Sequence, residues 1–179
     1  MNAAFRILAS LGAVVFVLGG CASGVTRMDA PAGSTAPAAA ASVPHVKSVT
    51  LWLNDDAKKL LADNLKFNQD TLRTMVERAL AANNLIKADS GQTLDIEITS
   101  IRARSNFSAV MFGFMAGNDH VEGVVTIKDA AGKLLKRGKV NASYALGGLA
   151  GGQDDARMGW LYETFSKHTV AEVTGTPAK

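Results

Sequence analysis

The clearest fold signal in this chain is HVEGVVTIKDAAGKLLKRGKVNASYAL, residues 120–146. On both sides of the turn at residues 129–132, apolar or small residues alternate with polar ones, as in two half-buried strands. Gly132 supplies the positive φ that the turn needs. The core-facing residues are predicted to be Val121, Gly123, Val125 and Ile127 in the first strand, and Leu134, Gly138, Val140, Ala142 and Tyr144 in the second. We therefore predict a β-hairpin with one polar face.

The segments around this hairpin predict a small α+β domain. Residues 45–53 and 93–104 alternate as strands, and residues 70–82 carry apolar side chains at helical spacing. Residues 155–173 form a final helix, which is expected to bury Met158, Leu161, Phe165 and Trp160. The order β-α-β-β-β-α predicts a mostly antiparallel sheet with two helices packed on one face.

Two local features add to this picture. Residues 55–65 favour a helix or an irregular helical approach to the longer helix that follows. Trp52 falls on the more polar face of the first strand, where we expect a helix or loop to cover it. The place of that strand is open: it can lie centrally, at an edge, or parallel to a neighbour.

The N-terminus has the anatomy of an export signal. One cation, Arg6, precedes an apolar run from Ile7 to Leu18, which is too short to span a bilayer. The run ends in Leu18, Gly19, Gly20 and Cys21, an order that is similar to the bacterial lipobox. That resemblance implies a signal peptide at residues 1–20, cleavage before Cys21, and diacylglycerol on the Cys21 thiol with acylation of the new N-terminus.

Such an anchor defines the expected location. Two or three acyl chains hold a protein stably on a membrane, whereas one chain does not. Ala22 follows the cysteine in place of the Asp that resembles an inner-membrane retention signal, so we expect the periplasmic face of an outer membrane in a diderm host. A monoderm host would leave the protein on the outer face of its only membrane. Cys21 is the one cysteine, so no intramolecular disulfide can form.

Composition divides the rest of the chain into three parts. Residues 21–44 are rich in Ala, Ser, Gly, Thr and Pro and predict a flexible tether. Residues 45–174 are long enough for one domain with one core, and residues 175–179 are a predicted disordered tail. The lipobox, the tether, the Gly-rich passage at 113–117, the turn at 129–133 and the Gly-rich stretch before the last helix resemble a family of small bacterial lipoproteins known only as a domain of unknown function. The resemblance implies architecture and location but no reaction.

Most of the chain argues against catalytic or nucleic-acid chemistry. The 19 Lys and Arg residues nearly balance the 16 Asp and Glu residues, so we expect no nucleic acid to bind. Residues 147–152 are glycine-rich, but no Gly-Lys-Ser/Thr follows them. His120 and Glu122 share a strand face while Asp119 points away, which leaves too few ligands for a metal. No histidine is placed to activate a serine. We therefore expect no enzyme activity, no metal and no cofactor.

One apolar stretch, residues 107–117, fits two interpretations. It either fills the core as a turn or short helix, or it contacts a protein partner or lipid through an exposed loop. Its candidate contact residues are Phe107, Met111, Phe112, Phe114 and Met115.

These observations lead to a functional hypothesis for the whole chain. We expect a non-catalytic, lipid-anchored envelope protein that binds or assembles another, unidentified envelope protein through a sheet edge or this stretch, with self-association possible. The alternative is a carrier or accessory for lipid or another apolar ligand in envelope transport.

Overall fold

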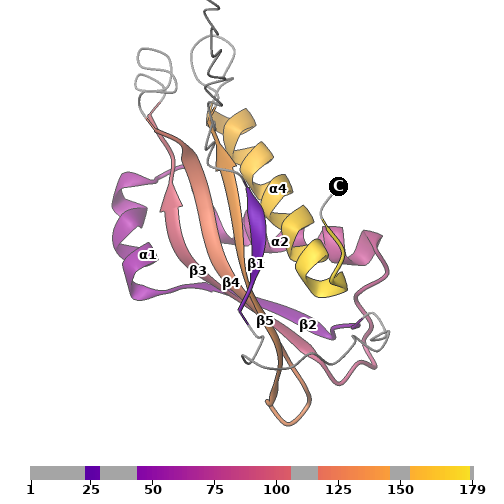
Figure 1. The fold of residues 1–179 in the computed structure, drawn as a ribbon. Coiled ribbons are helices and arrows are strands. Elements are labelled where there is room, and N and C mark those ends of the chain that lie inside the picture. The colour runs from indigo at the N-terminus through magenta and orange to yellow at the C-terminus, as the bar shows by residue number, and fades with distance from the viewer. Residues whose placement is uncertain (1–22, 29–43, 106–116, 146–153, 178–179) are drawn as a thin grey trace, which may run out of the picture.

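The computed structural model describes residues 23–28, 44–105, 117–145 and 154–177 (Figure 1). The predicted signal peptide, Cys21 and most of the predicted tether lie outside these residues. Residues 107–116 of the apolar stretch also lie outside them.

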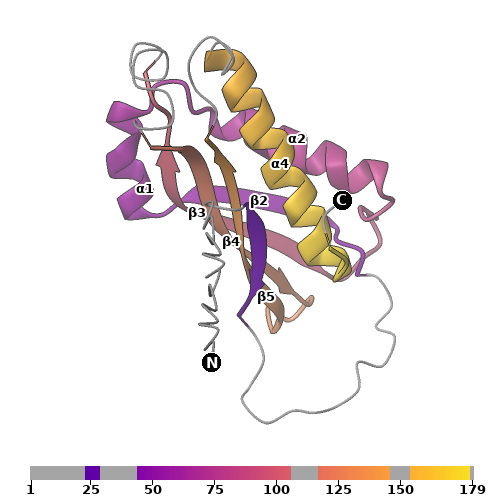
Figure 2. The same cartoon turned by 45° about the horizontal axis from the view of Figure 1, so that its top comes forward.

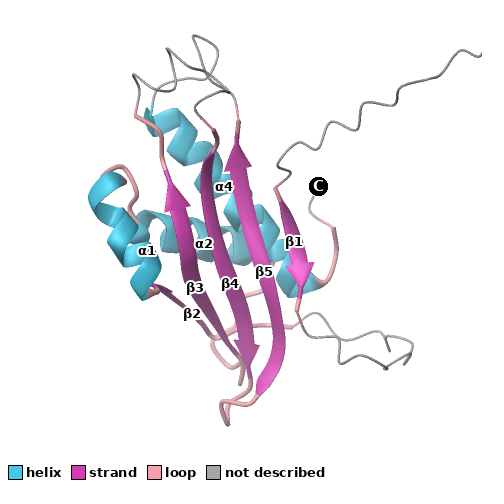
Figure 3. Cartoon of the chain, turned by 60° about the vertical axis from the view of Figure 1, so that its left-hand side comes forward, coloured by secondary structure: helices cyan, strands magenta, loops and turns pink. Residues whose placement is uncertain are grey.

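Five strands form one mixed sheet in the order β1-β5-β4-β3-β2 (Figure 3). All neighbouring strands are antiparallel except β2 and β3, which are parallel. The strands are β1 (Gly24–Arg27), β2 (Ser48–Leu53), β3 (Thr93–Arg102), β4 (Asp119–Lys128) and β5 (Leu134–Tyr144). The fold is α+β, as predicted, but the sheet gains a strand and is mixed. The first predicted strand, β2, takes one edge, parallel to β3.

The predicted hairpin is confirmed as β4 and β5. Gly123 pairs with Val140, and Gly132 has a φ of +81° in the turn. Asp129 stabilises this turn because its side chain accepts hydrogen bonds from the Ala131 and Lys133 amides at 2.9 Å each.

The strand β1 corrects the tether prediction at four residues. It pairs with β5 from Gly24 opposite Asn141 to Arg27 opposite Gly138. The sequence gives little sign of this strand because Val25 is its one apolar residue. Long-range pairing with β5, rather than local propensity, places it in the sheet.

Two long helices cover one face of the sheet, α2 (Gln69–Ala82) and α4 (Asp154–Thr174) (Figure 2). Asn68 caps α2 by accepting a hydrogen bond from the Thr71 amide at 2.8 Å. The Tyr162 hydroxyl accepts the Asn68 amide at 2.6 Å, which ties the start of α2 to α4. A shorter helix, α1 (Asp55–Leu60), follows β2 and runs into the 3-10 turn η1 (Leu61–Asp63).

The core lies between the sheet and these two helices. Its fully buried side chains include Leu72 and Leu80 of α2, Ile96 and Ile98 of β3, and Phe165 of α4. Burying one such side chain stabilises the fold by about 1.5–3 kcal/mol. The hydrophobic periodicity of α2 and the alternation of β3 and β4 therefore predicted the core correctly.

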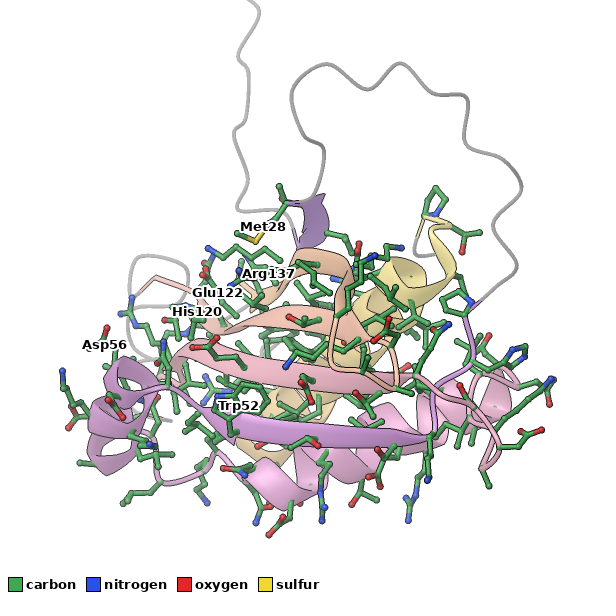
Figure 4. All side chains as sticks on the ribbon, turned by 90° about the horizontal axis from the view of Figure 1, so that it is seen from below. Met28, Trp52, Asp56, His120, Glu122 and Arg137 are labelled. Atoms are coloured by element: carbon green, nitrogen blue, oxygen red, sulfur yellow. The ribbon has the colours of Figure 1, made fainter. Side chains whose placement is uncertain are left out.

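Three apolar residues differ from the prediction. Trp52 and Trp160 are each 39% exposed, although we expected a helix or loop to cover the first and the core to bury the second. Trp52 lies on the sheet face that the helices leave open (Figure 4). Leu134 is 47% exposed because the register of β4 and β5 shifts between Ile127 and Lys128.

Candidate functional site

All of the site residues predicted from the sequence lie outside the described residues. Leu18, Gly19, Gly20 and Cys21 lie there, as do Phe107, Met111, Phe112, Phe114 and Met115. Of the stretch 107–117, Gly117 is described, with a φ of +81°. The positive φ favours glycine, and a Cβ at this position would also lie 2.8 Å from Nη1 of Arg102.

The described flanks of these segments meet at one end of the sheet, the upper end in Figure 3. Arg102 pairs with His120, and His120 pairs with Ser143. The Ser143 amide donates to Ser23 Oγ at 2.7 Å, and that hydroxyl donates back to the Ser143 carbonyl at 3.2 Å. Asn118 Nδ2 also donates to Ser143 Oγ, at 3.2 Å. We call this region, defined by these five residues, the Ser143 end.

A buried ionic cluster lies just inside the Ser143 end. Asp119 Oδ1 accepts hydrogen bonds from the Arg104 amide at 2.6 Å and from Arg104 Nε at 3.1 Å. Asp119 Oδ2 lies 3.1 Å from Nη2 of Arg104 and 3.3 Å from Nη1 of Arg157. All three side chains are at most 3% exposed. Two guanidinium groups therefore share one carboxylate away from water.

This cluster joins four elements of the fold. Arg157 Nη2 donates to the Arg104 carbonyl at 2.9 Å, and Arg104 Nη2 donates to the Tyr144 carbonyl at 3.4 Å. The cluster thus fixes the chain just after β3, the start of β4, the end of β5 and the first turn of α4. The adjoining cavity of about 10 Å³ has room for about one water molecule. The cluster therefore ties these parts of the chain together.

The cluster also corrects one sequence interpretation. Asp119 does point away from His120 and Glu122, as predicted. It is, however, a buried ion-pair partner and not a solvated strand residue. No sequence spacing reveals this, since Arg104 and Arg157 reach Asp119 from separate elements.

A serine and a histidine do meet on the open face of the sheet. Ser100 Oγ lies 3.0 Å from His120 Nε2, a contact that the sequence did not predict. A register shift between Ile98 and Ser100 brings Ser100 opposite Glu122, and strict alternation could not predict it. Burial lowers the pKa of His120, and the Glu122 carboxylate opposes this shift.

A hydrolase site needs more groups than a serine and a histidine. A serine nucleophile needs a base that a third group orients, as well as donors for the developing oxyanion. The Glu122 carboxylate forms an ion pair with Lys139 at 3.1 Å. Figure 4 shows His120 and Glu122 on the same side of the sheet.

Glu172 of α4 carries a second buried carboxylate, which lies between this helix and the sheet, close to β1. Glu172 is 1% exposed, and its Oε1 lies 3.6 Å from Lys136 Nζ. Lys136 Nζ also donates to the Glu172 carbonyl. A cavity of about 580 Å³ opens beside it, lined by Ser23, Gly24, Val25, His168, Ala171, Glu172, Gly175, Thr176 and Pro177. The strand β1 therefore forms one wall of this cavity.

Metal and membrane-spanning features are absent from the described part of the chain. Within it, no three His, Cys, Asp or Glu residues come together to hold a metal ion. Among the same residues, no helix is long and apolar enough to cross a membrane.

Residues 28–148 match the family described as Domain of unknown function (DUF4410). The chain belongs to this family. The match begins after β1 and ends before α4, yet both elements pair or pack with the DUF4410 core. The folded unit is therefore longer than the family match. The expected resemblance to a domain-of-unknown-function family is confirmed at this level.

Solved structures show only distant similarity to this DUF4410 protein. The PelC dodecamer from Paraburkholderia phytofirmans is 9% identical with a TM-score of 0.47, covering 83% of this chain and 96% of that one. A minor lipoprotein from Acinetobacter baumannii is 12% identical with a TM-score of 0.46, covering 76% and 99%. These similarities are too distant to transfer a function. The comparison with curated proteins gave no match.

Proposed function

We propose that this DUF4410 protein is a non-catalytic, lipid-anchored protein of the cell envelope that binds or assembles a partner. The anchor is Cys21, and the proposed location is the periplasmic face of the outer membrane. The observation that carries the proposal is the contact between Ser23 and Ser143. Because of it, the folded domain begins two residues after the proposed lipid-bearing cysteine.

The anchoring part is tested with Cys21→Ser. We expect the native protein to incorporate an alkyne-labelled fatty acid and to fractionate with membranes. The variant should incorporate none, because the thioether-forming thiol is gone, and should leave the membrane fraction. A native protein without label, or a variant that stays in the membrane fraction at normal levels, would contradict the proposal.

The binding part is supported by the outer edge of β2. This edge strand pairs only with β3 among the described strands. A groove of about 550 Å³ runs beside it, lined by Lys47, Ser48, Val49, Thr74, Glu77, Arg78, Ala81 and Ile86. An extended partner strand can add to such an edge through backbone hydrogen bonds. Gln69 Nε2 already donates to the Leu51 carbonyl at 3.0 Å, so Ser48 to Thr50 is the more accessible part.

In-cell photocrosslinking tests this edge. A photoreactive residue at Ser48 should give one discrete adduct with an envelope protein, and the same residue at Ala131 in the β4–β5 turn should not. An adduct between two copies of this chain would show self-association as the assembly mode. No adduct at Ser48, or equal adducts at both positions, would contradict binding at this edge.

The alternative, a lipid carrier, has less support. Carriage needs an apolar cavity between the helices and the sheet. In the described residues that space holds fully buried side chains such as Leu72, Ile96 and Phe165. Mass spectrometry of protein purified without its anchor would detect bound lipid if the carrier hypothesis were right.

The non-catalytic part has its own test. We expect Ser100 to be inert toward a serine-reactive fluorophosphonate probe, because the Glu122 carboxylate is already paired with Lys139. Labelling that disappears in Ser100→Ala would overturn this part of the proposal.

A further inference from the structure

We infer that the Ser143 end of the sheet lies directly against the lipid headgroups of the membrane that holds Cys21, with Trp160 at the headgroup level. This inference rests on the proposed lipidation of Cys21. It adds an orientation of the domain and a membrane-contacting residue, neither of which follows from lipidation alone.

The first step is the length of chain between lipid and fold. Ser23 is fixed to Ser143 by two hydrogen bonds, and β1 continues along β5 to Arg27. The Met28 amide then donates to the Arg137 carbonyl at 3.2 Å. Only Ala22 lies between Cys21 and Ser23, and a fully extended chain spans at most about 7 Å over these two steps.

The second step concerns the Ala- and Pro-rich segment. It follows β1 and precedes β2, so it lies after the point where the chain is already fixed to the sheet. It cannot act as a spacer between the lipid and the domain, as the sequence suggested. The Ser143 end must therefore stay within about 10 Å of the cysteine that carries the acyl chains.

The third step is an aromatic pair at the same end. Tyr144 follows Ser143, and its ring packs on Trp160 of α4 with centroids 5.0 Å apart and an interplanar angle of 57°. Trp160 is 39% exposed, although the hydrophobic pattern of α4 predicted it to be buried. Tryptophan and tyrosine are enriched where membranes meet water, because their rings are apolar at one end and polar at the other. A headgroup layer fits this pair better than water does.

The chain contains a matched control for this inference. It has two tryptophans, and Trp52 is exposed to the same fraction as Trp160. Trp52 lies in the edge strand farthest from β1 and pairs with Glu97, which pairs with Val124. Val124 is four residues along β4 from His120, so Trp52 lies about 13 Å along the strands from the level of His120.

The experiment uses the full-length, lipidated protein in phosphatidylethanolamine/phosphatidylglycerol vesicles whose acyl chains are brominated near the headgroup. Trp52→Phe leaves Trp160 as the one fluorophore, and Trp160→Phe leaves Trp52. We expect bromine to reduce Trp160 emission at least about two-fold and to leave Trp52 emission unchanged, because this quenching acts only near contact. Equal quenching of both, or quenching of Trp52 alone, would overturn the inference.

A spacer variant tests whether the short connection between Cys21 and Ser23 sets the orientation of the domain. About 20 Gly and Ser residues inserted between Ala22 and Ser23 should abolish the quenching of Trp160, because the domain can then leave the surface. Unchanged quenching would overturn the claim that the short connection sets the orientation. Protein that carries no acyl chain and does not float with vesicles would contradict the proposed function. Lipidated, floating protein with unquenched Trp160 would contradict this inference alone.

Discussion

The carboxyl group of Glu172 lies directly over Gly138, so close that a Cβ on Gly138 would be 2.5 Å from Cδ of Glu172. Gly138 belongs to β5 and faces α4, which carries Glu172. The missing side chain on the strand thus makes room for the buried carboxylate on the helix. This relationship fixes how close α4 packs to the sheet beside β1.

Gly138→Ala is therefore expected to destabilise the protein. The new methyl group cannot fit without moving α4 or turning Glu172 off its rotamer, and such overpacking costs about 1–3 kcal/mol. Chemical denaturation should show this as a lower free energy of unfolding. The matched control is Gly159→Ala in α4, where nothing lies within 4 Å of the added Cβ. That change should stabilise the helix by about 0.5–1 kcal/mol. Destabilisation of equal size in both variants would contradict this account.

The pair of Lys136 and Glu172 predicts a non-additive mutant cycle. Lys136→Met leaves Glu172 buried without its cation, which should cost about 1–3 kcal/mol because Lys136 itself is partly exposed. Glu172→Gln keeps the shape and removes the charge. In the double variant the loss should be smaller than the sum of the two single losses, since no buried charge is left unpaired. Additive losses in urea denaturation would show that the two charges do not interact.

Asp119→Asn should be among the most destabilising polar substitutions in the described chain. It keeps the side-chain shape but removes the carboxylate charge that two buried guanidinium groups share, which costs about 3–5 kcal/mol. Thermal unfolding should show a large fall in Tm. Asp56→Asn is the control, because Asp56 pairs with Lys59 at 2.9 Å on an exposed surface. We expect its Tm to match the native value, and an equal fall in both variants would refute the role of burial.

The sequence predicted those parts of the fold whose signals are local. The β4–β5 hairpin follows from alternation around one turn, and Gly132 has the positive φ expected there. The helix α2 follows from its periodic apolar residues and ends at Ala82, with Asn83 as its C-cap next to Asn84, which has a φ of 57°. In both cases each residue's own preference agrees with the final structure.

The parts that the sequence missed depend on distant residues. The strand β1 exists because it pairs with β5, more than a hundred residues away. Ser100 meets His120 only because the β3–β4 register shifts. Asp119 is buried because Arg104 and Arg157 approach it from two other elements. None of these pairings leaves a periodic trace in the sequence.

The environment of His120 predicts how stability depends on pH. Burial disfavours the charged imidazolium and lowers the pKa of His120 in the folded protein below its ordinary value of 6.5. The neutral ring also suits the contact of Nε2 with Ser100 Oγ at 3.0 Å. The unfolded chain therefore takes up a proton at a higher pH than the folded protein does.

The sign of the effect follows from this difference. Above about pH 6.5 the ring is neutral in both states, and its contribution to stability is complete. As the pH falls from there to the lower folded pKa, the unfolded state binds more protons and the free energy of unfolding decreases. Below the folded pKa the loss is complete and His120 adds no further slope.

His120→Gln removes this group while His45 and His168 stay as common background. Between about pH 7.5 and 5.5 the free energy of unfolding should fall less steeply in the variant than in the native protein. The NMR titration of the His120 ring protons should give an apparent pKa below 6.5 in the folded state. A ring that titrates at or above 6.5, together with equal pH slopes for the two proteins, would show that partial burial of His120 does not lower its pKa.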